Sequence, residues 1–353
     1  MCNIMRESLR RLAGSGSTSE EGMARAGTGT KRVRVQLLDG EYISVDVERK
    51  ARGFDLLERI CDDLDIVERD YFGLMRANHS DRVWLDMERT LAKTFRNEPW
   101  EVRFVVKFYP PEPSELNDDN TRYQVGLAVR HDIMEGRLRC SCITHALLAS
   151  YMLQAELGDH EVRVPGVQLV ARRALPPHLL TSDLEDKVDE LYRKHKGQSP
   201  AEAELNYLEN AKKLALYGAE LHQAKDSDDV DIALAVCWRG IAVLRDMVVM
   251  NRFPWTKIIK ISYKKRLFTL RLRAGECDDW HTCLSFRLPT IRACKTLWRC
   301  SVEHHIFFRR EGPVLVERVS GFPRLGSRRV SCRRTLRQLT AHLHDNHLSY
   351  SHI

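Results

Sequence analysis

The chain has 353 residues, of which 43% are hydrophobic and 30% charged, and its formal net charge is +7. Its length exceeds the ~100–200 residues of a typical domain, and the apolar fraction is sufficient for packed cores, which excludes a single small domain and a largely unfolded chain. The most apolar helix candidate, "CITHALLASYMLQAEL", is interrupted by His145 and Ser150 and is shorter than the ~20 apolar residues needed to cross a bilayer. The composition therefore predicts a soluble protein of several domains.

The 10 cysteines form no Cys-x-x-Cys pair and no repeating frame, which argues against a zinc ribbon or a disulfide scaffold. Cys300, His304 and His305 fall in one predicted helix, where Cys300 and His304 share a face. The sequence offers no third ligand beside them. We therefore interpret them as core residues, place the protein in a reducing compartment, and expect no metal and no cofactor.

Residues 1–31 are rich in Gly, Ser and Thr and predict a disordered tail, although apolar residues beside arginines near the start weakly resemble a transit peptide. Residues 32–109 begin with two alternating strands, "RVRVQLLDG" and "YISVDVE", around a Gly40 turn. A helix, "FDLLERICDDLDI", and three further strands, "YFGLMRA", "RVWLD" and "EVRFVVKFY", follow. A hairpin, a helix and short strands in this order predict a ubiquitin-like roll.

Residues 110–215 change character, because a proline-rich linker leads into helical periodicity. The expected helices are 117–136, 141–157, 182–196 and 200–215. The last begins with Ser199-Pro200-Ala201-Glu202, which combines an N-cap, a proline at the first helical position and a capping-box glutamate. This region predicts a compact helical bundle.

Residues 211–225, "AKKLALYGAELHQAK", form a basic amphipathic stretch that allows two interpretations. The first is the last helix of the bundle, with Leu214, Leu216 and Tyr217 buried, and we favour it. The second is a helix of the kind that calmodulin binds.

Residues 216–310 return to strands and close with one long helix that begins at Pro289. A strand meander followed by a single helix predicts a module of the pleckstrin-homology or phosphotyrosine-binding type, with a peptide groove between a strand edge and the helix. We expect the strand in "HTCLSFRL" to provide that edge. Its outward residues, facing an incoming peptide, are then Cys283, Ser285 and Arg287.

A predicted hairpin in this module carries Lys264, Lys265 and Arg266 at its tip, where Gly, Asn or Asp is usual. Basic residues near an anionic membrane contribute about 1 kcal/mol each, so the tip is a candidate phosphoinositide contact. On these three residues alone we favour the other interpretation, a solvated turn kept soluble by its charge.

Residues 311–353 form a basic tail that we expect to be largely disordered, with seven arginines and one acid from Arg318 onward. Ser331 within "SRRVSCRRT" fits a basophilic kinase site, and phosphate there would reduce the positive charge of the tail. The tail could also neutralise nucleic-acid phosphates. Because it lacks interleaved aromatics and the rest of the chain is almost neutral, we rank nucleic-acid binding well below membrane anchoring.

Several strings in the chain resemble the FERM domain of the protein 4.1 group: "YFGL", "VWLD", "VKFYPPEP", "RLRC", "LLASYMLQAELGD", "LENAKKLALYGAEL", "NRFPW" and "SVEHHIFFR". The resemblance runs from about Arg32 to Arg309. It implies an α+β, three-lobed fold: a ubiquitin-like roll at 32–109, a bundle like acyl-CoA-binding protein at 110–215, and a PH/PTB-like sandwich with a closing helix at 216–310.

The resemblance also implies a non-catalytic cytoplasmic adaptor at the plasma membrane and cell cortex. Such an adaptor joins the tails of transmembrane proteins and phosphatidylinositol bisphosphate to cortical cytoskeletal proteins, with calmodulin as a regulator. The group has a similar Tyr-Lys-Arg string at the hairpin tip, implicated in lipid binding. The inositol-phosphate site of ezrin-like members does not transfer, because Asp86 and Glu88 follow Trp84-Leu85 here and would repel phosphate.

Two alternatives remain beside the adaptor. One is nucleic-acid binding through the basic tail. The other is a regulatory FERM fragment of a larger protein such as a FERM-containing phosphatase. The chain contains no His-Cys dipeptide, P-loop or Gly-x-Ser-x-Gly motif, and we expect no catalysis.

Overall fold

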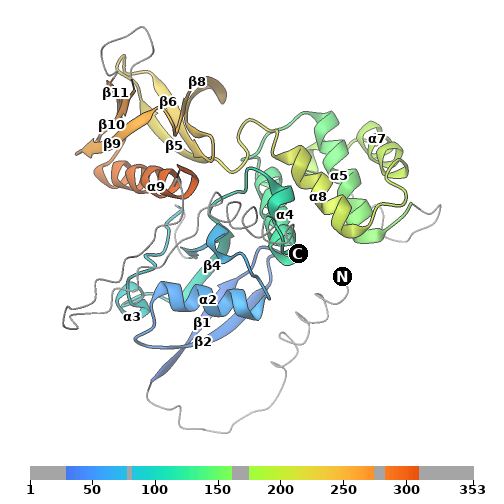
Figure 1. Ribbon diagram of the computed structural model, residues 1–353, viewed down its shortest axis with the longest axis horizontal. Helices are drawn as coiled ribbons and strands as arrows, with labels where there is room; N and C mark the ends of the chain where they lie inside the picture. Colours follow the sequence, from blue (N-terminus) through green and yellow to red (C-terminus); the bar gives the residue numbers. More distant parts are fainter. Residues whose placement is uncertain (1–28, 78–81, 161–174, 274–282, 310–353) are drawn as a thin grey trace, which may run out of the picture. The chain divides into compact units, whose positions relative to one another are not determined.

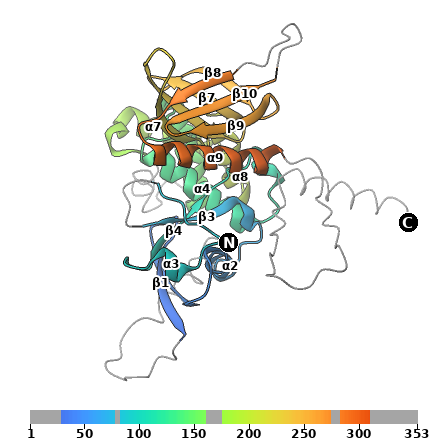
Figure 2. The same ribbon diagram turned by 90° about the vertical axis from the view of Figure 1, so that its left-hand side faces the viewer.

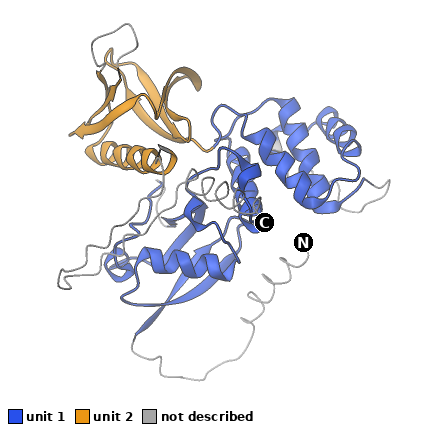
Figure 3. Cartoon of the chain, viewed as in Figure 1, with its two compact units in different colours: residues 1–217 blue, residues 218–353 orange. Residues whose placement is uncertain are grey.

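The computed structural model describes residues 29–77, 82–160, 175–273 and 283–309. The chain divides into two compact units, residues 1–217 and residues 218–353 (Figures 1 and 3). The first unit contains a four-stranded sheet and a group of helices, and the second contains seven strands and one long helix. Ser331 and the basic tail lie outside the described residues.

A mixed sheet forms the first part of unit 1, in the order β2-β1-β4-β3. Its strands are β1 Thr30–Gln36, β2 Tyr42–Glu48, β3 Phe72–Arg76 and β4 Glu101–Val106. β1 pairs antiparallel with β2 and parallel with β4. Alternate residues of β1 and β2 are buried and the others face outward, as the period-two pattern predicted. This is the expected ubiquitin-like roll.

Helix α2, Gly53–Asp63, packs its apolar stripe against this sheet (Figure 1). Leu56, Ile60 and Cys61 on that stripe are fully buried. The Asp55 carboxylate accepts a hydrogen bond from the Arg52 backbone N–H at 2.8 Å, which satisfies one of the unpaired donors at the start of the helix. Two smaller elements complete the roll: η1 Arg69–Tyr71 and α3 Leu91–Thr94.

Two boundaries in this sheet differ from the sequence prediction. β1 begins at Thr30, so the last two residues assigned to the N-terminal tail belong to the strand. The predicted strand "RVWLD" is reduced to one isolated bridge between Met75 and Trp84. The alternation of "RVWLD" resembles that of a strand, but the structure pairs it only at this point.

The helical part of unit 1 contains η2 Pro113–Glu115, α4 Asp119–Met134, α5 Cys142–Leu157, η3 Pro177–Leu179, α7 Ser182–Arg193 and α8 Pro200–Ala211. The predicted start of α8 is confirmed. The Ser199 side chain accepts from the Glu202 N–H, and the Glu202 carboxylate accepts from the Ser199 N–H at 2.8 Å. Asp118 caps α4 and also accepts a hydrogen bond from the Val67 N–H at 3.0 Å, which ties the helices to the roll.

The basic stretch 211–225 is not one helix. α8 ends at Ala211, and Glu220–Lys225 forms β5. Tyr217 is buried as expected, and its hydroxyl donates to the Pro110 carbonyl at 3.2 Å. The helical interpretation is therefore wrong beyond Ala211, because Glu220–Lys225 pairs along β6 and Ala224 joins the core of the second unit. Calmodulin could bind residues 211–225 as a helix only if β5 left its sheet.

The second unit has the strand order β8-β7-β6-β5-β11-β10-β9. Its strands are β5 Glu220–Lys225, β6 Asp231–Cys237, β7 Gly240–Arg245, β8 Val248–Pro254, β9 Ile258–Lys264, β10 Leu267–Leu272 and β11 Cys283–Arg287. A single pair, Arg287 with Lys225, joins β11 to β5. β5–β8 and β9–β11 therefore behave as two sheets joined at one corner.

Helix α9, Ile291–Arg309, lies along the open side of these two sheets (Figures 1 and 2). It begins just after Pro289, as predicted, and the Thr290 hydroxyl accepts from the Ala293 N–H at 3.0 Å. Cys294 and Leu297 on α9 join Leu234, Val236 and other strand residues in one core cluster. No described helix is both long and apolar enough to span a membrane.

Gly240 fixes the turn between β6 and β7. Its φ is +134°, and an added Cβ would lie 2.1 Å from the Phe253 carbonyl oxygen. Only glycine permits this approach of β7 to β8.

Candidate functional site

The cationic hairpin tip lies between β9 and β10, as the alternation predicted. Lys264 pairs with Leu267, which leaves Lys265 and Arg266 as a two-residue turn. All three basic side chains are exposed, and none forms an ion pair with a carboxylate in the described part of the chain. The Arg266 carbonyl accepts a hydrogen bond from the Leu288 N–H at 2.8 Å. The backbone of the tip is therefore anchored, while its charges face solvent.

Lys265 occupies a conformation that a lysine rarely adopts. Its φ is +56°, in the left-handed region where glycine or asparagine is usual. The chain thus has a strained cation at this turn instead of the common turn residues.

The outward side chains of β9, β10 and β11 form one surface, which we call the outer face. The strand registers align them in three rows: Lys264, Leu267 and Arg287; Ser262, Thr269 and Ser285; Lys260, Arg271 and Cys283. The Thr269 and Ser285 hydroxyls lie 3.3 Å apart. The outer face therefore has a hydroxyl row between two rows that carry cations.

Charge on the outer face is unequally neutralised. Arg287 forms an ion pair with Asp229. Lys260, Lys264 and Arg271 form no such pair with any described carboxylate. The predicted lipid residues and the predicted groove residues thus lie on the same surface, and its end nearest the tip carries most of the unpaired positive charge.

The predicted groove strand is misplaced. Cys283, Ser285 and Arg287 do face outward, with Phe286 buried, as expected. However, β11 lies between β10 and β5, so it is not the edge strand beside the helix. Pairing of Phe268 with Phe286 and of Leu270 with Leu284 places apolar side chains on the inner face and holds β11 inside the strand order. The terminal strand beside α9 is β9.

The β9 edge has the features of a strand-addition site. A two-residue turn makes Lys264 and Leu267 a hydrogen-bonded pair, so the backbone groups of Ser262 also point toward β10. Those of Ile261 and Tyr263 point away, toward the free edge. The Trp298 Nε1–H of α9 donates a hydrogen bond to the Ile261 carbonyl at 3.2 Å. The ring centroids of Trp298 and Tyr263 are 5.4 Å apart.

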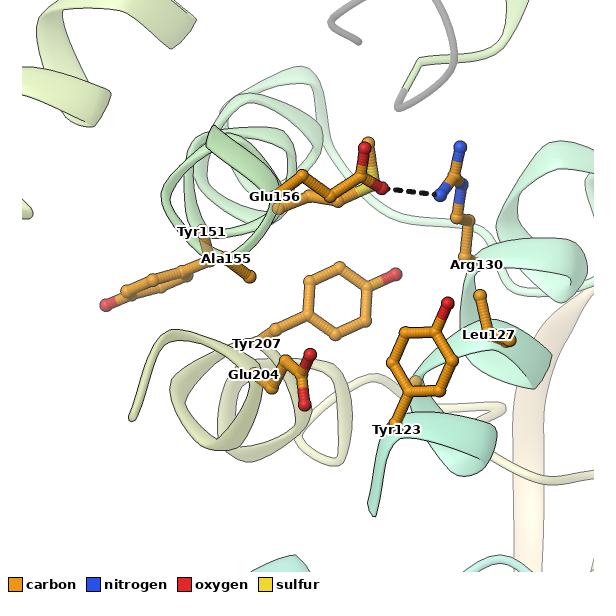
Figure 4. A pocket seen from close by; sticks show the side chains of 10 residues that line it. Tyr123, Leu127, Arg130, Tyr151, Ala155, Glu156, Glu204 and Tyr207 are labelled. Atoms are coloured by element: carbon orange, nitrogen blue, oxygen red, sulfur yellow. Dashed lines mark hydrogen bonds and ion pairs between the residues drawn. The ribbon is translucent and has the colours of Figure 1, made fainter. Parts of the chain in front are cut away.

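A second candidate is a pocket among α4, α5 and α8 in unit 1, which encloses about 570 Å³ including space open to solvent. Figure 4 shows Tyr123 and Tyr207 between the Glu204 carboxylate and an ion pair of Arg130 with Glu156. That pair is 3.1 Å long. The lining is mainly aliphatic and aromatic, and its charged members are Arg130, Glu156 and Glu204. A mainly apolar lining with a few polar groups is usual for ligand pockets.

Glu204 is the unusual group in this pocket. Burial raises the pKa of Glu204 to about 7, and the nearby carboxylates Asp119 and Glu156 add to the rise, while Arg122 opposes it. The protonated form of Glu204 is therefore favoured at pH values where an exposed glutamate is ionised. No sequence pattern indicated this shift, because Glu204 occupies an ordinary position in an amphipathic helix.

The structure also supplies ligands that the sequence could not place beside Cys300. Glu220 and His222 on β5 bring a carboxylate oxygen and an imidazole nitrogen close to the Cys300 sulfur, all within 4.8 Å of one another. The interpretation that no third ligand stands near Cys300 is therefore wrong. The only sequence signal was the i, i+2 spacing of Glu220 and His222, which places both on one face of a strand.

The roll, the bundle and the two-sheet module with its closing helix define the class of protein, a three-lobed FERM protein. Three domain families match in chain order. They are the FERM N-terminal domain at residues 35–97, the FERM central domain at 111–222 and the FERM C-terminal PH-like domain at 226–315. A FERM and C-terminal domain complex of Drosophila Merlin has the same fold, with a TM-score of 0.70 at 23% identity, over 78% of this chain and 96% of that one.

The curated relatives narrow the class. The chain is 50% identical over 296 residues to "Protein 4.1 homolog" of Drosophila melanogaster, covering 83% of this chain and 17% of the relative. It is 46% identical over 296 residues to "Protein 4.1" of Homo sapiens, covering 84% of this chain and 34% of the relative. The chain belongs to the protein 4.1 group of FERM-domain proteins. It spans 17% and 34% of the length of these two relatives.

Proposed function

We propose that this protein is a peripheral membrane adaptor. It binds acidic inositol lipid through the hairpin tip and outer face, and it binds the cytoplasmic tail of a transmembrane protein along the β9 edge, linking both to the cell cortex. Two observations support this: the family, and a strand edge beside a cationic surface in a single unit. The proposal requires no catalysis.

The observation that carries the lipid part is the set of exposed cations at the tip, Lys264, Lys265 and Arg266. Lys260 and Arg271 add two more exposed cations to the same face, beyond the hydroxyl row. Each basic residue near an anionic surface contributes about 1 kcal/mol, and several act together at this end of unit 2. The hydroxyl row behind them can donate further hydrogen bonds to phosphate oxygens.

Vesicle binding tests the lipid part. Replacement of Lys264, Lys265 and Arg266 by alanine should weaken binding to phosphatidylinositol bisphosphate vesicles severalfold, and the loss should shrink as salt rises, because charges are screened over about 8 Å at 0.15 M. The matched control is Arg193, Lys194 and Lys196 to alanine, which removes the same charge from exposed positions in unit 1. If the tip variant and the control variant bound vesicles equally well, the tip would be a solvated turn with no role in lipid binding.

The peptide part proposes that a tail adds to β9 as an extra strand. Main-chain hydrogen bonds to Tyr263 provide affinity, and α9 provides the side-chain contacts, as in other strand-addition sites. Trp298 already occupies the Ile261 carbonyl, so an incoming strand has to pair on either side of it or displace the indole.

Proline substitutions distinguish β9 from the originally predicted β11. Tyr263→Pro removes an outward N–H and should weaken binding of tail peptides, identified by pull-down of membrane proteins, whereas Tyr263→Ala removes the ring alone. Ser285→Pro should leave that binding intact if the folded protein is recovered. If Ser285→Pro weakened peptide binding and Tyr263→Pro did not, the peptide site would lie at Cys283, Ser285 and Arg287, as the sequence predicted.

For the tail, which lies outside the described residues, we propose one role: phosphorylation of Ser331 regulates membrane binding. Phosphorylation there adds about −1.5 to −2 charge beside several arginines. We expect it to reduce vesicle binding of the full chain. The comparison is phosphorylated against unphosphorylated protein, with Ser331→Ala treated by the same kinase as control, and unchanged binding would remove this switch.

A further inference from the structure

A group of buried polar residues lies between β5 and α9 in the second unit. We call Glu220, His222, Cys300 and His304 the buried polar cluster. Glu220 is 9% exposed, Cys300 4% and His304 2%. The His222 side chain is 11% exposed. The neighbouring core consists of aliphatic and aromatic side chains such as Leu297 and Trp255.

The local geometry explains why these residues meet. Glu220 and His222 are two apart on β5, and Ala224, two further on, belongs to the core, so all three face inward. Cys300 and His304 are four apart on α9 and lie on its buried stripe with Leu297 and Phe307. The inner faces of one strand and one helix thus converge on a single polar point.

The distances suit a small cation. The His222 Nε2 and a Glu220 carboxylate oxygen are 3.5 Å apart. One imidazole nitrogen, one carboxylate oxygen and the Cys300 sulfur all lie within 4.8 Å of one another. Zinc binds nitrogen and oxygen at about 2.0–2.2 Å and sulfur at about 2.3 Å, which places tetrahedral ligands about 3.3–3.7 Å from one another. Small side-chain adjustments would bring all three atoms onto one ion.

The donor types also select the metal. A thiolate, an imidazole and a carboxylate together are the ligands of zinc, whereas magnesium and calcium take oxygen ligands. His304 supports the thiolate from outside the ligand set. Its Nδ1 lies 2.9 Å from the Cys300 carbonyl oxygen and 3.6 Å from the Cys300 sulfur. Such supporting hydrogen bonds orient a ligand and tune the metal.

We propose that Glu220, His222 and Cys300 bind one zinc ion, with water at the fourth position, and that this ion fastens α9 to β5. A divalent cation stabilises a carboxylate and a thiolate together in a low-dielectric interior, where an isolated charge is costly. Zinc also displaces the thiol proton of Cys300 to solvent when it binds, so affinity rises with pH. Because Trp298 is two residues before Cys300, the ion also steadies the helix that borders the β9 edge.

Cobalt and zinc are the probes, and the full chain is the sample. The wild-type protein should retain one equivalent of zinc after gel filtration. Its cobalt form should show thiolate-to-cobalt charge-transfer absorption and tetrahedral visible bands. Cys300→Ser should abolish those bands and weaken zinc binding about 100-fold or more, since even lost second-layer contacts cost 10–100-fold.

Cys294→Ser is the matched control, because Cys294 is also fully buried on α9 but lies outside the cluster. It should keep the cobalt bands and the zinc, and zinc should raise the melting temperature of this variant and of the wild type but not of Cys300→Ser. Glu220→Gln, which keeps size and hydrogen bonding, should weaken zinc binding without unfolding the unit. Metal bound elsewhere, for example at Cys140 and Cys142 or at histidines outside the described residues, would persist in Cys300→Ser.

Identical zinc content and identical cobalt spectra in wild type and Cys300→Ser would overturn the proposal. So would a wild-type chain that binds neither metal, in which case the cluster is a hydrogen-bonded group within the core.

Discussion

The hairpin tip and the buried polar cluster are two polar groups of the same unit that differ in almost every physical respect. Lys264, Lys265 and Arg266 are exposed and contribute charge without packing. Glu220, His222 and Cys300 are inside, and their polar atoms are close enough to share one ion. The tip can therefore change without affecting the fold. The cluster cannot, because every change there also alters the interior.

This difference decides which experiments separate function from stability. At the tip, loss of binding with an unchanged melting temperature identifies a contact. In the cluster, loss of stability is expected from any substitution, so metal spectra and a buried control cysteine are needed. Surface charge pairs contribute about 0–1 kcal/mol, whereas an unpartnered buried charge costs several.

The largest expected effect tests whether the tip can be changed independently of the core, which begins only two residues after Arg266. Phe268 is fully buried on β10, just after exposed Leu267. Phe268→Ala should lower the free energy of unfolding of unit 2 by about 3–5 kcal/mol, because it opens a cavity. The triple alanine tip variant should change it by less than ~0.5 kcal/mol. Urea unfolding, followed by hydrogen exchange in β9 and β10, measures the change in unfolding free energy of each variant. Similar changes in the two variants would contradict the claim that the tip is independent of the core.

The second prediction extends the comparison to a partly buried carboxylate in unit 1. The pKa of Glu204 is raised by burial to about 7, so the folded state holds a proton that the unfolded state releases near pH 4.5. Stability is therefore full below that pH and falls as pH rises through 7. Glu204→Gln should stabilise the helical part on the order of 2 kcal/mol at pH 8 and have no such effect at pH 4.

Carboxyl chemical shifts in a pH titration by NMR measure the pKa of Glu204 directly, and hydrogen exchange in α8 reports the stability. Glu202→Gln is not a suitable control, because Glu202 caps the helix. Glu185→Gln, at a half-buried position on α7, is a suitable control. A Glu204 titration near 4.5 would show that the pocket is wet enough to solvate the charge.

The third prediction sharpens the comparison at the β9 edge, where the half-buried ring of Trp298 meets an exposed strand. Trp298→Phe keeps an aromatic ring near Tyr263 but removes the donor to the Ile261 carbonyl. The free energy of unfolding of unit 2 should fall by about 1 kcal/mol, the usual net contribution of one hydrogen bond. Peptide binding should tighten, because the carbonyl becomes available. Weaker peptide binding would mean that the indole contacts the peptide itself.

The smallest effect concerns the strain at the tip. Lys265 has a φ of +56°, which glycine adopts freely. Lys265→Gly should therefore leave stability unchanged or raise it by about 0.5 kcal/mol, while removing one cation. Arg266→Gly removes the same charge at a residue without positive φ, so it should not stabilise. Thermal unfolding of both variants separates strain from charge.

The sequence by itself determined the order of elements in this protein. Alternation specified β1, β2, β9 and β10, and the Ser199–Glu202 cap specified the start of α8, because these signals depend on residues close together in the chain. It also located the cationic tip, since an exposed turn needs no distant partner. The family strings then joined these local features into one fold.

Only the tertiary structure decided which distant segments meet. It placed β11 inside the strand order and β9 at the edge, and it turned residues after Gly218 into β5 instead of helix. It brought Glu220 and His222 to Cys300 across about eighty residues of chain, and it buried Glu204. Burial and long-range proximity depend on how faces pack together, and no short window of sequence contains that information.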